Sequence, residues 1–116
     1  MAEISTGAGV NARVFAMLHE IKEGLKDMQG CGEARMLLYG SRARGDFDEH
    51  SDIDVAIIVE NLSRELKARI LEMIADKELT YLIPLSVIVF SARDFNLLKE
   101  RERRIALDIE KEGILL

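Results

Sequence analysis

The sequence contains one cysteine, one proline, two histidines and no tryptophan. The lone cysteine, Cys31, cannot form an intramolecular disulfide. A structural zinc site is not expected either, because such a site needs several cysteine and histidine ligands. We therefore expect a cytoplasmic protein in a reducing compartment, stabilised by its hydrophobic core.

Long apolar segments are also missing. The longest stretch without a charged residue, 79–92, is interrupted by Pro84 and is shorter than the roughly 18 to 20 residues that a membrane-spanning helix needs. The first residues include Glu3 and lack the basic and apolar segments of a signal peptide. We expect no contact with a membrane.

An excess of positive charge is the third absence. The chain has 16 Lys and Arg against 21 Asp and Glu, a net charge of −5. Proteins that bind long nucleic acids through the phosphates need a positive surface, so direct nucleic-acid binding is not expected. A small phosphate ligand carried on a metal ion is still compatible with this charge.

The length and the apolar pattern predict one domain, 1–116, of α/β or α+β class. Apolar residues with helical spacing predict helices at residues 9–29 and 63–78 and one continuous helix between Ser91 and Gly113. Short apolar runs predict strands at 35–39, 53–59 and 82–90. This order predicts a small mixed sheet with helices packed on it.

The segment 40–54 carries most of the chemistry. It reads GSRARGDFDEHSDID and connects two predicted strands. Gly40 allows a backbone to approach a ligand closely, and Ser41 offers a hydroxyl and an amide to phosphate oxygens. Arg42 and Arg44 add positive charge beside them.

Asp52 and Asp54 are two residues apart at the start of a predicted strand, so both side chains are expected on one face. Two adjacent carboxylates repel each other, and a bound Mg²⁺ or Mn²⁺ relieves that repulsion. The alternative is an acidic, solvent-exposed turn that binds nothing, which is what most Asp-rich turns are.

The combination of Gly40-Ser41, ten further residues and Asp52-x-Asp54 resembles the signature of the DNA polymerase β nucleotidyltransferase superfamily. The residues GSRARG followed by Ser51-Asp52-Ile53-Asp54 resemble its minimal nucleotidyltransferase branch, as does the closing segment 111–115. The resemblance implies a polymerase-β-like nucleotidyltransferase fold.

It also implies roles for individual residues. Gly40 and Ser41 would contact the β- and γ-phosphates of a nucleoside triphosphate, and Asp52 and Asp54 would be catalytic ligands of Mg²⁺. The further nucleotide-binding residues would be Arg42, Arg44 and Ser51.

The sequence departs from the family pattern at one position. Members usually carry a third carboxylate on the next strand, which ligates a second metal and deprotonates the acceptor. Here Ser86 stands at that position. Two nearby acids, Glu60 and Glu78, are not obvious substitutes.

The resemblance implies an enzyme that transfers AMP from Mg-ATP to a hydroxyl of a partner protein. That partner would be a HEPN-domain toxin, with this chain as its antitoxin in a homo- or hetero-oligomer. Because of Ser86, a second interpretation is a catalytically weak or inactive antitoxin or regulatory subunit that binds nucleotide and neutralises its partner by binding only. A third is a structural interaction domain whose aspartates hold no metal.

Overall fold

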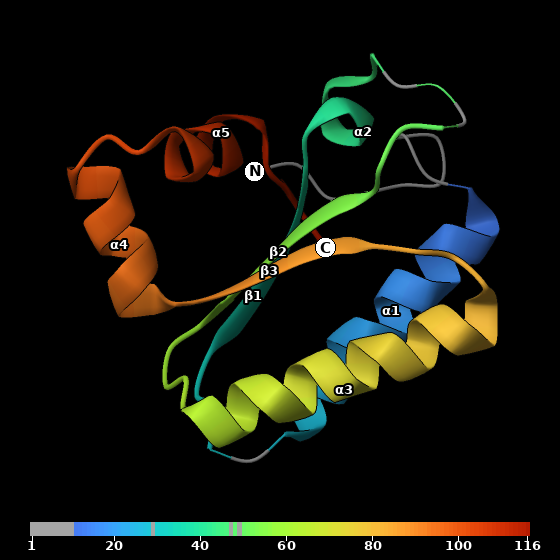
Figure 1. The fold of residues 1–116 in the computed structure, drawn as a ribbon, viewed down its shortest axis with the longest axis horizontal. Coiled ribbons are helices and arrows are strands. Elements are labelled where there is room, and N and C mark those ends of the chain that lie inside the picture. The colour runs from blue at the N-terminus through green and yellow to red at the C-terminus, as the bar shows by residue number, and fades with distance from the viewer. Residues whose placement is uncertain (1–10, 29, 47, 49) are drawn as a thin grey trace.

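The computed structural model describes residues 11–28, 30–46, 48 and 50–116. Its elements follow the order helix, strand, short helix, strand, helix, strand, two helices and a short strand (Figure 1). The helices are α1 (Ala12–Asp27), α2 (Ser41–Arg44), α3 (Arg64–Tyr81), α4 (Ala92–Glu100) and α5 (Arg104–Glu112). The strands are β1 (Ala34–Tyr39), β2 (Asp54–Val59), β3 (Ser86–Ser91) and β4 (Ile114–Leu115).

The four strands form one mixed sheet in the order β3-β2-β1-β4. Strand β1 is antiparallel to both β2 and β4, whereas β2 and β3 are parallel. A parallel pair needs a crossover connection, which α3 supplies. The predicted α+β class with a small mixed sheet is confirmed.

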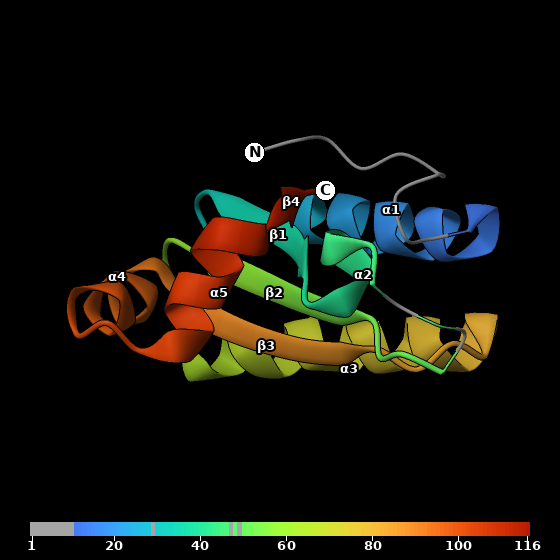
Figure 2. The same cartoon turned by 90° about the horizontal axis from the view of Figure 1, so that it is seen from above.

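Helices cover both faces of the sheet (Figures 1 and 2). The β-branched residues of β2 form the centre of the core because successive side chains point to opposite faces. Val55, Ile57 and Val59 lie in the cluster with α1 and α3. Ala56 and Ile58 lie in the cluster with α4 and α5. Among the described residues, no helix is long and apolar enough to cross a bilayer.

The prediction of one helix between Ser91 and Gly113 is wrong. Helix α4 ends at Glu100, and Glu102 adopts a left-handed conformation with φ 53° before α5 begins. The six residues 99–104 are all charged, so no apolar side chain holds a helix against the sheet there. The break lets Phe95 of α4 and Ile109 of α5 enter the same buried cluster.

The largest boundary difference from the prediction lies between α3 and β3. The third strand begins at Ser86 rather than at residue 82, because α3 continues to Tyr81 and Leu82 then takes a left-handed φ of 56°. Pro84 therefore lies before the strand, where its missing N–H removes no bond of the sheet. The start of the first predicted helix, 9–10, lies outside the described residues.

Candidate functional site

A row of three polar side chains crosses the sheet where β1 ends and β2 and β3 begin. Tyr39 pairs with Asp54 across the antiparallel strands, and Asp54 pairs with Ser86 across the parallel ones. Paired residues in neighbouring strands project from the same face. This is the face that carries Ala56 and Ile58, which α4 and α5 cover further along β2.

Gly40 brings the start of α2 against this row. Its φ of 77° and ψ of −157° define a conformation that residues with a side chain rarely adopt. A Cβ at this position would collide with the Asp54 carboxylate. The Gly40 carbonyl accepts N–H groups of Ala43 and Arg44 at 3.1 and 3.0 Å. The Gly40-Ser41 turn and Asp54, fourteen residues apart in sequence, are therefore adjacent in space.

The half-buried Asp54 carboxyl has a pKa above its usual range. Burial is the main cause, and the negative charge of Asp52 adds to it. A hydrogen bond from the Ser86 side chain and the positive charge of Arg44 act in the opposite direction. The protein alone thus leaves the Asp54 charge undercompensated, which favours binding of a cation.

Asp52 lies just before β2 and is exposed. It is close enough to Asp54 for its charge to raise the pKa of that carboxyl. The strand begins at Asp54, two residues after Asp52, so Asp52 belongs to the incoming loop. The structure brings the two aspartates together, and their role as metal ligands stays a prediction.

The loop before Asp52 is held to α2 by Arg42. The Arg42 guanidinium donates to the carbonyl of Ser51 at 3.0 Å. Ser51 in turn closes a tight turn with Asp48: its hydroxyl accepts the Asp48 N–H at 3.0 Å and its N–H donates to the Asp48 carbonyl at 3.1 Å. Arg42 and Ser51, two of the predicted nucleotide-binding residues, therefore fix the conformation of the loop before Asp52.

Arg44, the last residue of α2, bonds to two acids. Its side chain donates to Asp46 at 3.1 Å and to both oxygens of Glu112, in α5, at 3.1 and 3.0 Å. These contacts raise the pKa of Arg44, and its guanidinium, which is charged in any case, places a positive charge near Asp54. Glu112 connects the C-terminal helix to the candidate site.

Sequence reasoning missed Tyr39 and Glu112. Tyr39 is buried, and its pKa is raised by burial and by the charge of Asp54. The position of Tyr39 directly before Gly40 was an available signal for its place beside the turn. Nothing in the sequence pairs Glu112 with Arg44, because the two residues are 68 positions apart.

Neither of the other two acids considered from sequence joins the site. Glu78 accepts the N–H of Leu85 at 3.0 Å, and Glu60, just past the far end of β2, faces the N–H of Glu33 at 3.3 Å. Within the described part of the chain, no group of three or more His, Cys, Asp or Glu side chains is placed to hold a metal ion. Among the described residues, the two aspartates are therefore the carboxylates that could ligate a metal here.

Comparison with known proteins agrees with this geometry. The profile of a family described as "Nucleotidyltransferase domain" matches residues 18–116. A candidate protein adenylyltransferase of Methanocaldococcus jannaschii is 32% identical over 78 residues, which cover 66% of this chain and 79% of that protein. The crystal structure of a candidate nucleotidyltransferase from Sulfolobus solfataricus has a TM-score of 0.51 and 18% identity, covering 89% of this chain and 75% of the other.

Proposed function

Because the chain belongs to the nucleotidyltransferase domain family, we propose that it transfers AMP from Mg-ATP to a hydroxyl group of a partner protein. One observation carries the proposal. The undercompensated Asp54 carboxylate lies directly against the Gly40-Ser41 turn. A cation held by the carboxylate and a phosphate held by the turn would therefore share one site.

The donor set of the site fits Mg²⁺. This ion prefers oxygen ligands, and it is commonly bound through one or two carboxylates with phosphate oxygens and water in the remaining positions. Asp52 and Asp54 supply the carboxylates. When bound, the ion would neutralise phosphate charge and polarise the phosphorus centre.

The chain's own residues would seat and orient the nucleotide. The Ser41 hydroxyl and the N–H groups at the turn are suited to the β- and γ-phosphates. Arg42 and Arg44 from α2 and Ser51 from the adjoining loop would contribute charge and hydrogen bonds to the phosphates. In the reaction, the acceptor oxygen bonds to the α-phosphorus while the bond to pyrophosphate breaks and the hydroxyl proton is lost.

Two arguments support a protein as acceptor. The relative from Methanocaldococcus jannaschii is named as a protein adenylyltransferase candidate. The resemblance to minimal nucleotidyltransferases further implies a HEPN-domain toxin as the partner, which we include in the proposal. Its acceptor group would be a side-chain hydroxyl.

A second function is favoured by Ser86. A serine hydroxyl beside Asp54 can hydrogen bond to the carboxylate or hold a water molecule, but it cannot act as a carboxylate ligand or base. The second proposal is therefore an antitoxin or regulatory subunit that binds Mg-ATP and its partner without transferring AMP.

Two measurements on the same proteins separate these functions. The first is transfer of label from ATP labelled at the α-phosphate to a co-purified HEPN-domain partner, with and without Mg²⁺. The second is calorimetric titration of Mg-ATP. Label transfer that Asp54→Asn abolishes supports the enzyme, whereas Mg-ATP binding without transfer supports the binding-only subunit. Equal Mg-ATP heats from wild type and from the double variant Asp52→Asn/Asp54→Asn would refute both.

A further inference from the structure

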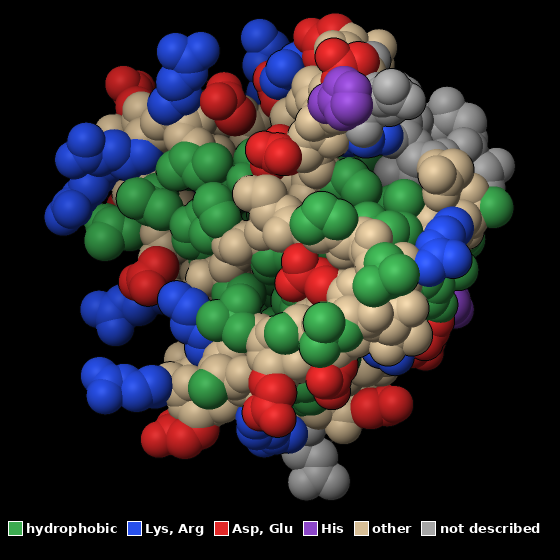
Figure 3. All heavy atoms as spheres, turned by 45° about the vertical axis from the view of Figure 1, so that its right-hand side comes forward, with side chains coloured by type: hydrophobic (Ala, Val, Ile, Leu, Met, Phe, Trp, Pro, Cys, Tyr) green, Lys and Arg blue, Asp and Glu red, His purple; other side chains and the backbone are tan. Residues whose placement is uncertain are grey.

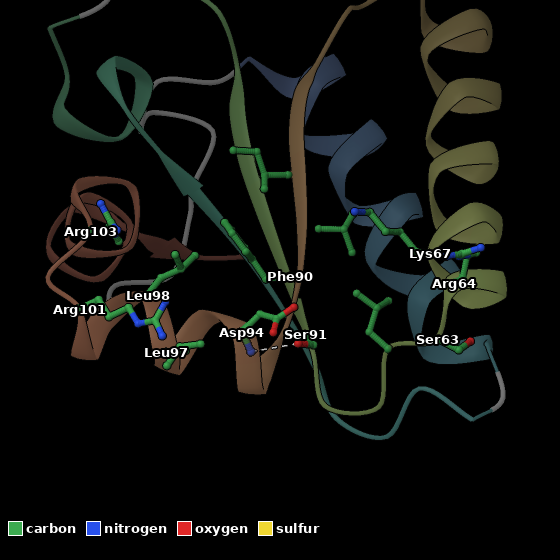
Figure 4. A pocket seen from close by; sticks show the side chains of 13 residues that line it. Ser63, Arg64, Lys67, Phe90, Ser91, Asp94, Leu97, Leu98, Arg101 and Arg103 are labelled. Carbon is green, nitrogen blue, oxygen red and sulfur yellow. Dashed lines mark hydrogen bonds between the residues drawn. The ribbon is translucent and has the colours of Figure 1, made fainter.

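A groove of about 810 Å³ lies along the part of β3 that is remote from Asp54. Helix α3 borders it on one side and α4 on the other, and β3 runs between them (Figure 4). Its apolar lining includes Ile88, Phe90, Leu97 and Leu98. None of the residues assigned to the nucleotide site lines this groove.

Strand β3 is an edge strand whose outer side pairs with no described segment. Ser86 donates its N–H toward β2, to the carbonyl of Ile53 at 3.0 Å. Because backbone groups alternate in direction along a strand, the N–H and C=O groups of Val87 and Val89 face the open side. An open edge of this kind is a template for an added strand.

The charge around the groove is opposite to that of the whole protein. Arg64 and Lys67 project from α3, and Arg101 and Arg103 from the turn after α4, whereas Asp94 is the only acid among the described residues of the lining. All four cations are exposed, and none forms an ion pair with a described residue. Lys and Arg side chains gather along the left-hand side of the surface in Figure 3. Four cations concentrated here, in a chain of net charge −5, favour an acidic ligand.

We propose that the groove binds an acidic, extended segment of a partner protein, which adds to the open edge of β3 as a further strand. The edge groups would bond to the backbone of the segment, the apolar lining would take alternate side chains, and the cations would pair with its acids. A second copy of this chain fits less well, because β3-to-β3 pairing would bring two sets of cations together. A nucleic acid fits less well because Phe90 packs on Phe95, with ring centroids 5.5 Å apart, instead of offering an open stacking surface.

The position of the groove also indicates which protein carries the acceptor hydroxyl. This inference rests on the proposed function. Strand β3 extends about 17 Å from Ser86 beside Asp54 to Ser91 in the groove. A segment docked along this edge therefore leads toward the nucleotide site. We infer that the docked protein is the one that presents the acceptor hydroxyl.

The test uses the full chain and a fluorescent ten-residue peptide in which glutamate alternates with valine. The matched peptide with lysine in place of glutamate and a single-stranded oligothymidine are the competing probes. Affinities are measured by anisotropy for wild type, for Lys67→Glu/Arg101→Glu in the groove, and for Lys26→Glu/Arg69→Glu, which makes the same change of charge outside it. Asp54→Asn separates docking from nucleotide chemistry.

We expect the acidic peptide to bind more weakly to the groove variant, by about tenfold at low ionic strength. Binding should be unchanged in the control variant and in Asp54→Asn, and hydrogen exchange at the Val87 and Val89 amides should slow in the complex. Equal loss in both charge variants, no binding of the acidic peptide, tighter binding of oligothymidine, or self-association that the groove variant abolishes would each overturn the proposal. Label transfer to the co-purified partner that the groove variant leaves unchanged would remove only the link between the groove and the acceptor, without affecting the docking proposal itself.

Discussion

Ser86 lies directly beside Asp54 on the neighbouring parallel strand, and its side chain hydrogen bonds to the Asp54 carboxylate. The bond opposes burial and the charge of Asp52, both of which raise the pKa of Asp54. Ser86, which has no carboxylate of its own, thus helps to keep Asp54 charged. The effect of Ser86 on metal binding is therefore testable apart from its effect on catalysis.

Replacing Ser86 by alanine should strengthen Mg-ATP binding at neutral pH. Without the hydrogen bond the pKa of Asp54 rises further, so the protein compensates the carboxylate charge less and a bound Mg²⁺ gains more from it. Because Ser86 is exposed, we expect a gain of about threefold to tenfold, below the range for a hydrogen bond to a charged group and within that for an ordinary hydrogen bond. Calorimetric titration measures this gain, and Ser86→Thr, which keeps the hydroxyl, is the control.

Replacing Ser86 by aspartate should act in two directions. A third carboxylate beside Asp54 adds repulsion to the metal-free protein, so its melting temperature should fall. The same carboxylate adds a ligand for Mg²⁺, so Mg-ATP should bind more tightly and AMP transfer should increase. Melting curves with and without Mg²⁺, together with the label-transfer assay, test both effects. A variant that gains neither affinity nor transfer would argue against a metal between β2 and β3.

The stability of the metal-free protein should depend on Asp54 in a defined direction. In an unfolded chain an aspartate titrates near pH 3.9, and folding raises the pKa of Asp54 above this value. Between the two values the folded state binds more protons, so the contribution of Asp54 to stability falls as pH rises and is level above the raised pKa. Asp54→Asn removes this dependence and should melt at a higher temperature than wild type at neutral pH.

The measurement is the difference in melting temperature between wild type and Asp54→Asn, taken across pH in the presence of EDTA. Taking the difference cancels the contributions of the other titrating groups. Saturating Mg²⁺ should stabilise wild type more than the variant and so reduce or reverse the difference. A difference that stays constant with pH would contradict the electrostatic account of the site.

The central part of the fold could be predicted from sequence because its signals are local. The β-branched run in β2 indicates a strand, and the spacing of apolar residues in α1 and α3 indicates helices. The break at Glu102 has no such signal, since a run of charged residues is compatible with both a helix and a turn. Strand β4 has only two residues, too few to show any period.

In the candidate site, too, the features with a local sequence signal could be predicted and the others could not. The spacing of Gly40 and Asp54 predicts a shared function, and the structure brings the two residues into contact. The bond from Arg44 to Glu112 depends on how α5 folds back over the sheet, which no local pattern encodes. Ser86 could be matched to the family pattern, but its hydrogen bond to Asp54 depends on the register between two strands.

The contact between Gly40 and Asp54 leads to a matched pair of variants. Gly40 and Gly45 both have positive φ, 77° and 87°, but a Cβ on Gly45 meets nothing within 4 Å, whereas one on Gly40 meets Asp54. Gly45→Ala should therefore cost about 1 kcal/mol of stability, the usual penalty of a left-handed conformation. Gly40→Ala should cost roughly 3 kcal/mol, because its backbone region is nearly exclusive to glycine and the new methyl group displaces a carboxylate.

The two variants should also differ in ligand binding. Displacing Asp54 separates the carboxylate from the turn, so Gly40→Ala should lose Mg-ATP binding even under conditions in which it is fully folded, whereas Gly45→Ala should retain it. Urea unfolding gives the stabilities, and calorimetry at low temperature gives the affinities. Equal Mg-ATP affinity in the two variants would mean that the turn and Asp54 do not act on one ligand, and the proposed site would have to be abandoned.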